Sequence, residues 1–221
     1  MFAKQLISAQ IPTLNLQDTG DAVLQLMSEV HLEQLVLIQD DSYKCLIQEQ
    51  DILNLERPEL PLSENISLLN FRPAVFENAH PHEAARLAVQ QSLNIVPVID
   101  KDEKYHGAIS LENLLEYISE HCGLLEPGGI ITLEVKPNDY SLSEIARICE
   151  SNDISILQSG VYTNKDTGML DITLKINRVE FSALIASFER YEYKVKEMFG
   201  EAPAFENLLN RYNLLMNYIN M

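Results

Sequence analysis

The stretch IVPVID (residues 95–100), continued by YHGAIS (105–110) and LENLL (111–115), decides the fold because the chain contains an earlier version of it. The earlier version, about sixty residues upstream, reads LVLIQDD (35–41), YKCLI (43–47) and QDIL (50–53). In both places a buried strand, an acidic turn, a second strand and a short helix follow in that order. Two copies are too few for a solenoid, which needs at least ~3 stacked repeats. The pattern therefore predicts two halves of one pseudo-symmetric domain, with a cleft where the halves meet.

The segments upstream of these strands repeat as well. Between residues 22 and 30, apolar side chains fall at the spacing of an amphipathic helix, at Ala22, Val23, Leu26, Met27 and Val30. Asp18 or Thr19 is a candidate cap for this helix. His80-Pro81 opens the corresponding helix of the second copy, with proline in the tolerated first turn. Each half therefore reads helix, strand, turn, strand, helix.

This arrangement resembles the CBS domain pair, also called a Bateman module. The resemblance is most specific over residues 95–113 and extends over roughly residues 1–121. It implies a CBS pair at 1–126, with repeats of about 1–60 and 61–126.

The resemblance also implies nucleotide-binding residues. In this family a hydroxyl residue followed three positions later by Asp or Asn opens the last helix and holds a ribose, and the proline strand holds the adenine. Ser110 and Asn113 match this element in the second repeat, next to Val96 and Pro97. In the first repeat Asp51 matches, but Gln48 and Cys45 replace the expected hydroxyl residue and glycine. The second repeat is therefore the better candidate site.

A nucleotide also needs positive charge near its phosphates, because an unpaired anion in a cleft is costly. Arg72 lies just before Pro73-Ala74-Val75, near where this family commonly places phosphates, although it could equally be a surface side chain. The scarcity of cations favours a monophosphate or a nucleoside-like ligand over a polyphosphate. The ligands implied by the resemblance are AMP, ADP, ATP and S-adenosylmethionine, and no obligatory cofactor is expected.

Composition excludes several classes of function. The chain has 221 residues, 46% of them apolar, a net charge of −17 and a pI near 4.6. Such an acidic body repels nucleic-acid phosphates and anionic membrane surfaces. Three widely spaced cysteines favour reduced thiols, and neither a signal peptide nor a membrane helix is visible. These features predict a cytoplasmic protein without nucleic-acid or membrane partners.

A second module is expected after Glu126-Pro127-Gly128-Gly129, where proline and two glycines end the preceding helix and free the chain. Residues 129–199 predict the order βαββαβ of a ferredoxin-like unit. Attached to a CBS pair, this order resembles an ACT domain. The resemblance implies amino-acid binding in the loop after the first strand, at Asn138 and Asp139, but that loop lacks the usual glycine. The alternative is a domain that serves only for pairing.

The segment 200–221 predicts a C-terminal amphipathic helix whose apolar stripe runs from Phe205 to Ile219. This stripe, the Ala22–Val30 face and the Leu114–Ile118 face present more apolar helix surface than a small monomer leaves in water. They predict a homodimer.

The predicted fold class is therefore α/β (α+β), with a tandem CBS pair, an ACT-like domain and a terminal helix. No nucleophile with its base, phosphate loop or zinc spacing is present, and His80 with His82 is too small a set for a metal. The sequence predicts a regulatory or sensor protein that binds an adenosine-containing ligand, acts on an unknown protein partner or on its own assembly, and is not an enzyme. The alternative is a ligand-free dimerisation scaffold.

Overall fold

The computed structural model describes residues 1–65 and 70–200. The chain forms two compact units, Met1–Ile118 and Ser119–Met221. The first unit contains both copies of the repeated pattern. The predicted apolar stripe from Phe205 to Ile219 lies outside the described residues.

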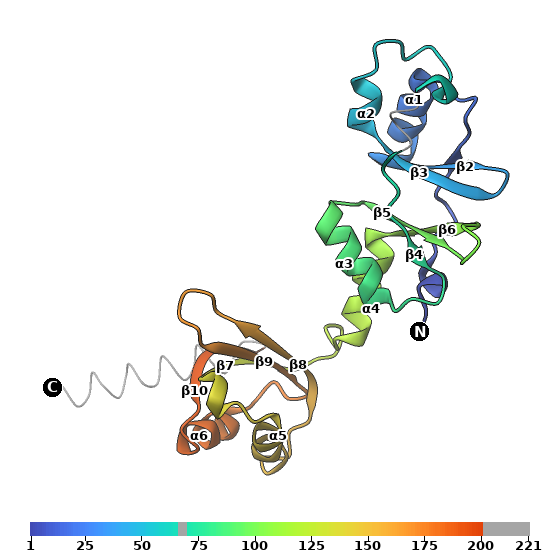
Figure 1. Cartoon of the computed structure of the whole chain (residues 1–221). Coiled ribbons are helices and arrows are strands. Elements are labelled where there is room, and N and C mark those ends of the chain that lie inside the picture. Colours follow the sequence, from blue (N-terminus) through green and yellow to red (C-terminus); the bar gives the residue numbers. More distant parts are fainter. Residues whose placement is uncertain (66–69, 201–221) are drawn as a thin grey trace. The chain divides into compact units, whose positions relative to one another are not determined.

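The two halves of the first unit share one topology (Figure 1). The first half consists of β1 (Thr13–Leu14), α1 (Gly20–Val30), β2 (Gln34–Gln39), β3 (Ser42–Gln48) and α2 (Glu49–Leu53). The second consists of β4 (Val75–Phe76), α3 (Pro81–Gln91), β5 (Ile95–Ile99), β6 (Tyr105–Ser110) and α4 (Leu111–His121). Short 3₁₀ helices η1 (Ala3–Leu6) and η2 (Leu62–Glu64) lie outside this repeated set.

Each half forms a three-stranded sheet, in the orders β1-β2-β3 and β4-β5-β6. The outer two-residue strand is parallel to the central strand, and the third strand is antiparallel to it. The repeated helix–strand–strand–helix order is confirmed. The sequence did not reveal β1 and β4, because two residues are too short for a periodic pattern.

Matching signals begin and end the first helices of the two halves. Thr19, and not Asp18, caps α1: its hydroxyl accepts from the Ala22 amide at 3.3 Å. His80 caps α3 through its ring nitrogen, ahead of Pro81. Both helices end at a left-handed residue, His31 or Ser92. Local chemistry thus sets the same helix length in both repeats.

The segments that precede β1 and β4 are exchanged between the two repeats. The Ser8 amide, ahead of β1, donates to the Ala108 carbonyl on β6 at 2.9 Å. The Leu46 amide on β3 donates to the Phe71 carbonyl, ahead of β4, also at 2.9 Å. Each third strand is therefore hydrogen-bonded to a residue that is distant in sequence, and the two repeats form one unit.

The helix faces expected to be free for dimerisation are partly used within the unit. On α1, Val23 and Met27 are buried in the core of the first repeat. On α4, Leu114 is buried, whereas Leu111 and Leu115 are 45% and 64% exposed. The expectation that the whole Leu114–Ile118 face is available was wrong: α4 turns Leu114 inward and leaves Leu111 and Leu115 outside.

The second unit has the predicted order βαββαβ. Its elements are β7 (Ile130–Val135), α5 (Leu142–Glu150), β8 (Ile156–Thr163), β9 (Leu170–Ile176), α6 (Ser182–Arg190) and β10 (Lys194–Phe199). The sheet has the order β10-β7-β9-β8 with antiparallel neighbours, which is the ferredoxin-like arrangement. Figure 1 shows α5 and α6 on the same face of this sheet, and the core lies between them and the strands.

Gly128 and Gly129 do not free the chain. A Cβ on Gly128 would lie 1.9 Å from the Ile176 carbonyl oxygen, and one on Gly129 would lie 2.3 Å from the Phe181 ring. The Gly129 amide donates to Arg178 O at 2.8 Å. The glycines are therefore required because backbone and ring approach closely, and they attach the entering chain to the second unit.

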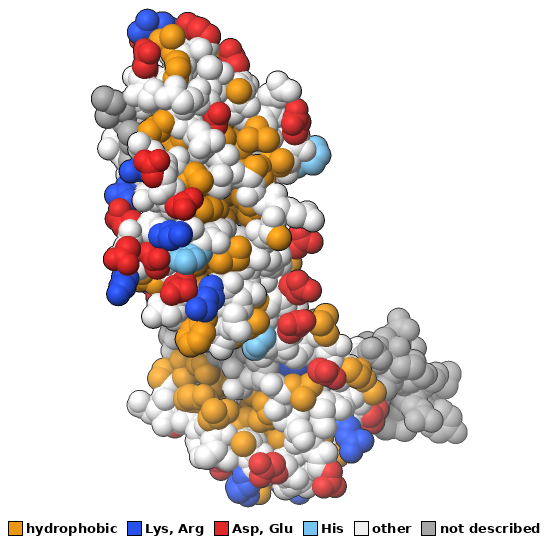
Figure 2. Space-filling view, turned by 90° about the vertical axis from the view of Figure 1, so that its right-hand side faces the viewer, with side chains coloured by type: hydrophobic (Ala, Val, Ile, Leu, Met, Phe, Trp, Pro, Cys, Tyr) orange, Lys and Arg blue, Asp and Glu red, His pale blue; other side chains and the backbone are white. Residues whose placement is uncertain are grey.

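The surface carries charges of both signs between hydrophobic side chains (Figure 2). Among the described residues, none of the helices has the length and apolar character needed to cross a bilayer. Over the same residues, no three His, Cys, Asp or Glu side chains are grouped to hold a metal ion.

Candidate functional site

The second-repeat candidates gather where β6 passes into α4. The Ser110 hydroxyl accepts from the Asn113 amide at 3.1 Å, which fixes the first turn of α4. Val96 and Pro97 are buried on β5 and lie opposite Ile109 and Ala108 on β6, the strand that ends at Ser110. The strand pairing thus brings the four predicted residues to one region of the repeat.

The N-terminal segment also reaches this region. The Asn113 amide group donates to the Leu6 carbonyl at 2.9 Å. Gly107 has φ +139°, and a Cβ there would lie 2.3 Å from Cγ2 of Ile7. Leu6 and Ile7 therefore belong to the site. Sequence reasoning missed them because they precede the repeat and carry no motif.

The first repeat builds the equivalent region with different chemistry. Gln48 stands at the N-cap of α2 without a side-chain hydrogen bond, whereas Ser110 caps α4. Cys45 occupies the position of Gly107 and is fully buried. Burial raises the pKa of its thiol to about 12, while the Arg72 charge lowers it and the Asp51 charge raises it. Both Arg72 and Asp51 therefore lie close enough to Cys45 to affect it electrostatically.

Arg72 is held where the two hairpins meet. Its guanidinium donates to the Tyr43 carbonyl at 3.2 Å and to the Glu103 carboxylate at 3.0 Å. It also lies 5.8 Å from the centre of the Tyr43 ring. The sequence grouped Arg72 with the second-repeat residues, but the contacts place it against β3 of the first repeat and the hairpin tip of the second.

A second candidate region lies in the second unit. Asn138 and Asp139 form part of the 3₁₀ helix η4 (Pro137–Asp139), and both are exposed. Asp139 lines a pocket of about 390 Å³, together with Glu144, Met169, Tyr191, Tyr193 and Lys194 among others. Asn138 does not line this pocket.

Glu144 organises one wall of the pocket. Its carboxylate accepts from the Tyr193 hydroxyl at 3.0 Å and lies 3.8 Å from the Arg147 guanidinium. Burial, with this hydrogen bond as a second cause, raises the pKa of Tyr193 to about 12. The pocket therefore presents the Asp139 and Glu144 carboxylates beside aromatic surface, and Lys136 and Lys194 also line it.

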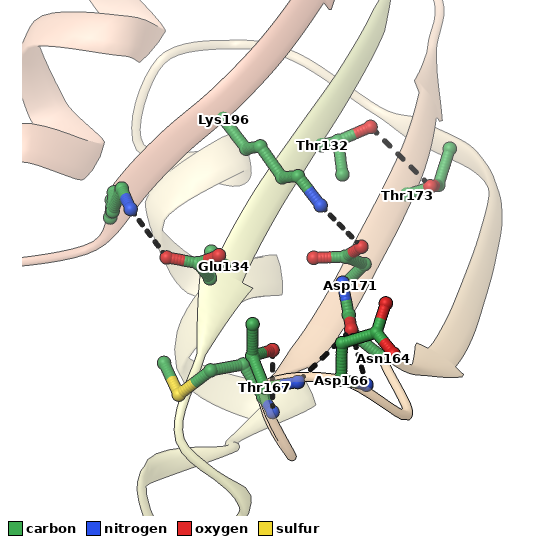
Figure 3. A network of polar contacts seen from close by, with 10 residues as sticks. Thr132, Glu134, Asn164, Asp166, Thr167, Asp171, Thr173 and Lys196 are labelled. Carbon is green, nitrogen blue, oxygen red and sulfur yellow. Dashed lines mark hydrogen bonds and ion pairs between the residues drawn. The ribbon is translucent and has the colours of Figure 1, made fainter.

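The strand face next to the pocket is polar. Figure 3 shows Lys196 directed at Asp171 and Thr132 at Thr173, with Glu134 paired to a basic side chain, Lys194. The Lys196–Asp171 distance is 2.6 Å. These pairs satisfy most of the charge on that face, and Glu134 and Lys194 also line the pocket.

Comparisons with known proteins find the CBS domain in the second repeat. The family model of the CBS domain matches residues 67–120, which include the second repeat's strands and all but the last residue of α4. A CBS domain-containing protein of Dictyostelium discoideum is 27% identical over 141 residues, covering 58% of this chain and 95% of that protein.

Two solved structures are also similar. A CBS domain pair/ACT domain protein from Thermotoga maritima is 21% identical, with a TM-score of 0.48, over 54% of this chain and 98% of that one. CBSX2, solved in complex with AMP, is 19% identical, with a TM-score of 0.46, over 54% of this chain and 96% of that one.

Proposed function

We propose that this chain is a regulatory protein whose CBS pair, residues 1–126, binds an adenosine-containing ligand and is not catalytic. The observation that carries the proposal is the junction of β6 and α4, where the Ser110 hydroxyl accepts from the Asn113 amide and β6 pairs with the strand containing Val96 and Pro97. The CBS domain match covers this junction. AMP, ADP, ATP and S-adenosylmethionine are the ligands to test.

Asn113 is the proposed ribose partner. An amide side chain has two donors and an acceptor, and the Leu6 carbonyl engages one donor. A ribose hydroxyl can use the remaining groups or replace Leu6. In the second case the ligand releases the N-terminal segment, and binding is coupled to the position of η1.

The second unit, residues 129–199, is proposed to be an ACT-like domain that pairs with a second copy and transmits the ligand-induced change. Its pocket beside Asp139 is a candidate for the ammonium group of an amino acid. Asn138, outside the pocket lining, is the weaker candidate.

A constitutive scaffold is the second candidate function, and one observation favours it. The Leu6 carbonyl already occupies one donor of the Asn113 side chain, and Ile7 lies against Gly107, so the N-terminal segment covers part of the second-repeat site. In that case the CBS pair contributes surface for dimerisation, through side chains such as Leu111 and Leu115.

Calorimetric titration of the full chain separates the two functions. AMP, adenosine, ATP and S-adenosylmethionine are titrated into wild type, Asn113→Ala and, as a control in the other unit, Asn138→Ala. Loss of one ribose hydrogen bond should weaken binding about 5- to 10-fold in Asn113→Ala only. Equal affinities in all three proteins would show that Asn113 does not contact the ligand. No heat of binding with any of the compounds would leave the constitutive scaffold as the remaining candidate function.

A further inference from the structure

The predicted phosphate-binding cation, Arg72, already has an anionic partner. Arg72 lies 3.0 Å from the Glu103 carboxylate, and the two side chains are 42% and 60% exposed. A second ion pair at the same junction joins Lys104 to Asp41 at 3.9 Å. An incoming anion therefore meets cations that carboxylates have partly neutralised.

Glu103 is well placed to compete, because its backbone is held. Its φ is +60°, at the left-handed position of the β5–β6 turn, and its carbonyl accepts from the Tyr43 amide at 2.9 Å. Arg72 is held in turn by the Tyr43 carbonyl and lies over the Tyr43 ring. Tyr43 thus positions the backbone of Glu103 and the side chain of Arg72, which keeps the two members of the ion pair close together.

We propose that Glu103 is an internal competitor for Arg72 that lowers the affinity of the first-repeat region for phosphate-bearing adenosine ligands relative to uncharged adenosine. The inference rests on the proposed function, with the ligand bound in the first repeat, where Asp51 is the predicted ribose partner and both Asp51 and Arg72 lie close to Cys45. A phosphate that pairs with Arg72 must displace the Glu103 carboxylate, whereas an uncharged nucleoside leaves the pair intact. Glu103 therefore sets the selectivity between phosphorylated and unphosphorylated ligands.

Displacement would also affect the junction. Glu103 follows Asp102 in the turn that pairs with the first hairpin, and the turn keeps its backbone bond to Tyr43 when the side chain leaves. The expected response to a phosphorylated ligand is therefore a local change at the hairpin tips, and the β-sheets remain intact.

The test compares two variants that remove one negative charge each from the same turn. Glu103→Gln abolishes the ion pair, and Asp102→Asn removes a carboxylate that, among residues 1–65 and 70–200, makes no ion pair. AMP and adenosine are titrated calorimetrically into wild type and both variants at constant ionic strength. The left-handed conformation tolerates Gln as well as Glu, and thermal melts confirm that the variants fold.

The expected result is a gain in AMP affinity of about 2- to 5-fold in Glu103→Gln beyond that in Asp102→Asn, which is the scale of an exposed ion pair. Adenosine affinity should be the same in all three proteins. Equal AMP affinities in the two variants, or an equal gain for adenosine, would overturn the competition while leaving the adenosine site in place. No binding of either compound to wild type would overturn the proposed function and this inference together.

Discussion

Tyr43 and Tyr105 occupy equivalent positions in the two repeats and bind each other's turns reciprocally. The Tyr43 amide donates to the Glu103 carbonyl, and the Tyr105 amide donates to the Asp41 carbonyl, both at 2.9 Å. Asp41 and Glu103 both have left-handed backbones, with φ of 61° and 60°. The two hairpins are therefore related by a local two-fold arrangement at their tips. The side chains break the symmetry: the Tyr43 hydroxyl donates to the Pro73 carbonyl at 2.8 Å, and no equivalent bond of Tyr105 is found among the described residues.

This asymmetry predicts different costs for the same substitution. Tyr43→Phe leaves a buried carbonyl without its donor and should lower the free energy of unfolding by about 1–2 kcal/mol. Tyr105→Phe is the matched control and should change it by less than about 0.5 kcal/mol. Urea unfolding followed by circular dichroism measures both. Equal losses would mean that the hydroxyl of Tyr43 does not secure the segment before β4.

Asn113→Asp separates the structural role of Asn113 from its proposed ligand role. The carboxylate keeps acceptors for a ribose but cannot donate to the Leu6 carbonyl, so the N-terminal segment should loosen. We expect a stability loss of about 1–2 kcal/mol and faster amide exchange at Ser8, with adenosine affinity kept within about 3-fold of wild type. Unchanged exchange at Ser8 would show that Asn113 does not retain this segment.

Gly107→Ala should destabilise the first unit for two reasons. Gly107 has φ +139°, and the added Cβ would lie 2.3 Å from Ile7. We expect a loss of about 2–4 kcal/mol, of which the backbone strain accounts for about 1–3 kcal/mol. The double variant with Ile7→Ala should recover the steric part, as a positive coupling in a double-mutant cycle.

Gly168→Ala is the control, because Gly168 has φ +71° and no atom within 4 Å of the added Cβ. Gly168→Ala should therefore lose only the free energy of unfolding that corresponds to backbone strain, about 1–3 kcal/mol. Cys45 takes the equivalent place in the first repeat without a positive φ, which explains why a side chain is accepted there. If Ile7→Ala gave no rescue, the contact between Ile7 and β6 would not matter for stability.

Buried thiols predict a loss of stability at alkaline pH. Burial raises the pKa of Cys45 to about 12 and that of Cys149 to about 11, from an ordinary value of 9.0. Between these values the unfolded state releases thiol protons that the folded state keeps, so the free energy of unfolding falls as pH rises. Well below pH 9 both thiols are protonated in both states, and their contribution is constant.

Urea midpoints measured from pH 8 to 10.5 should therefore fall more steeply for wild type than for Cys45→Ala, after each is normalised to pH 8. The half-buried Cys122 should react first with a thiol reagent in the native protein, because Cys45 and Cys149 are buried. Parallel pH profiles for wild type and Cys45→Ala would contradict the burial of this thiol.

The proposed homodimer predicts a light-scattering mass about twice the 25.1 kDa of the chain. Leu115 on α4 is 64% exposed, and Leu53 on α2 is 58% exposed. If α4 forms the interface, Leu115→Lys should shift the mass to that of a monomer at micromolar concentration, while Leu53→Lys stays dimeric. A monomeric wild type would refute the dimer, and a monomeric Leu53→Lys would move the interface to α2.

Much of the fold follows from local chemistry in the sequence. The alternation of Leu170, Ile172, Leu174 and Ile176 is typical of a half-buried strand and coincides with β9. Ser141 is a residue type that favours helix N-caps, and its hydroxyl accepts from the Glu144 amide at the start of α5. The repeat of strand, turn and strand is equally visible, because side-chain periodicity and turn residues act within a few positions of the chain.

Only the tertiary structure decided which distant segments meet. Three contacts join positions far apart in sequence. The Leu6 carbonyl accepts from Asn113, the Phe71 carbonyl accepts from the Leu46 amide on β3, and Arg72 forms an ion pair with Glu103. Backbone carbonyls make several of these contacts, and a carbonyl leaves no trace in residue identity. The sequence by itself determined the two repeats and the ferredoxin-like order of the second unit. Only the folded chain brings the N-terminal segment to Asn113 in the second repeat and Glu103 to Arg72 beside the first. Both contacts depend on which distant backbone segment passes each residue.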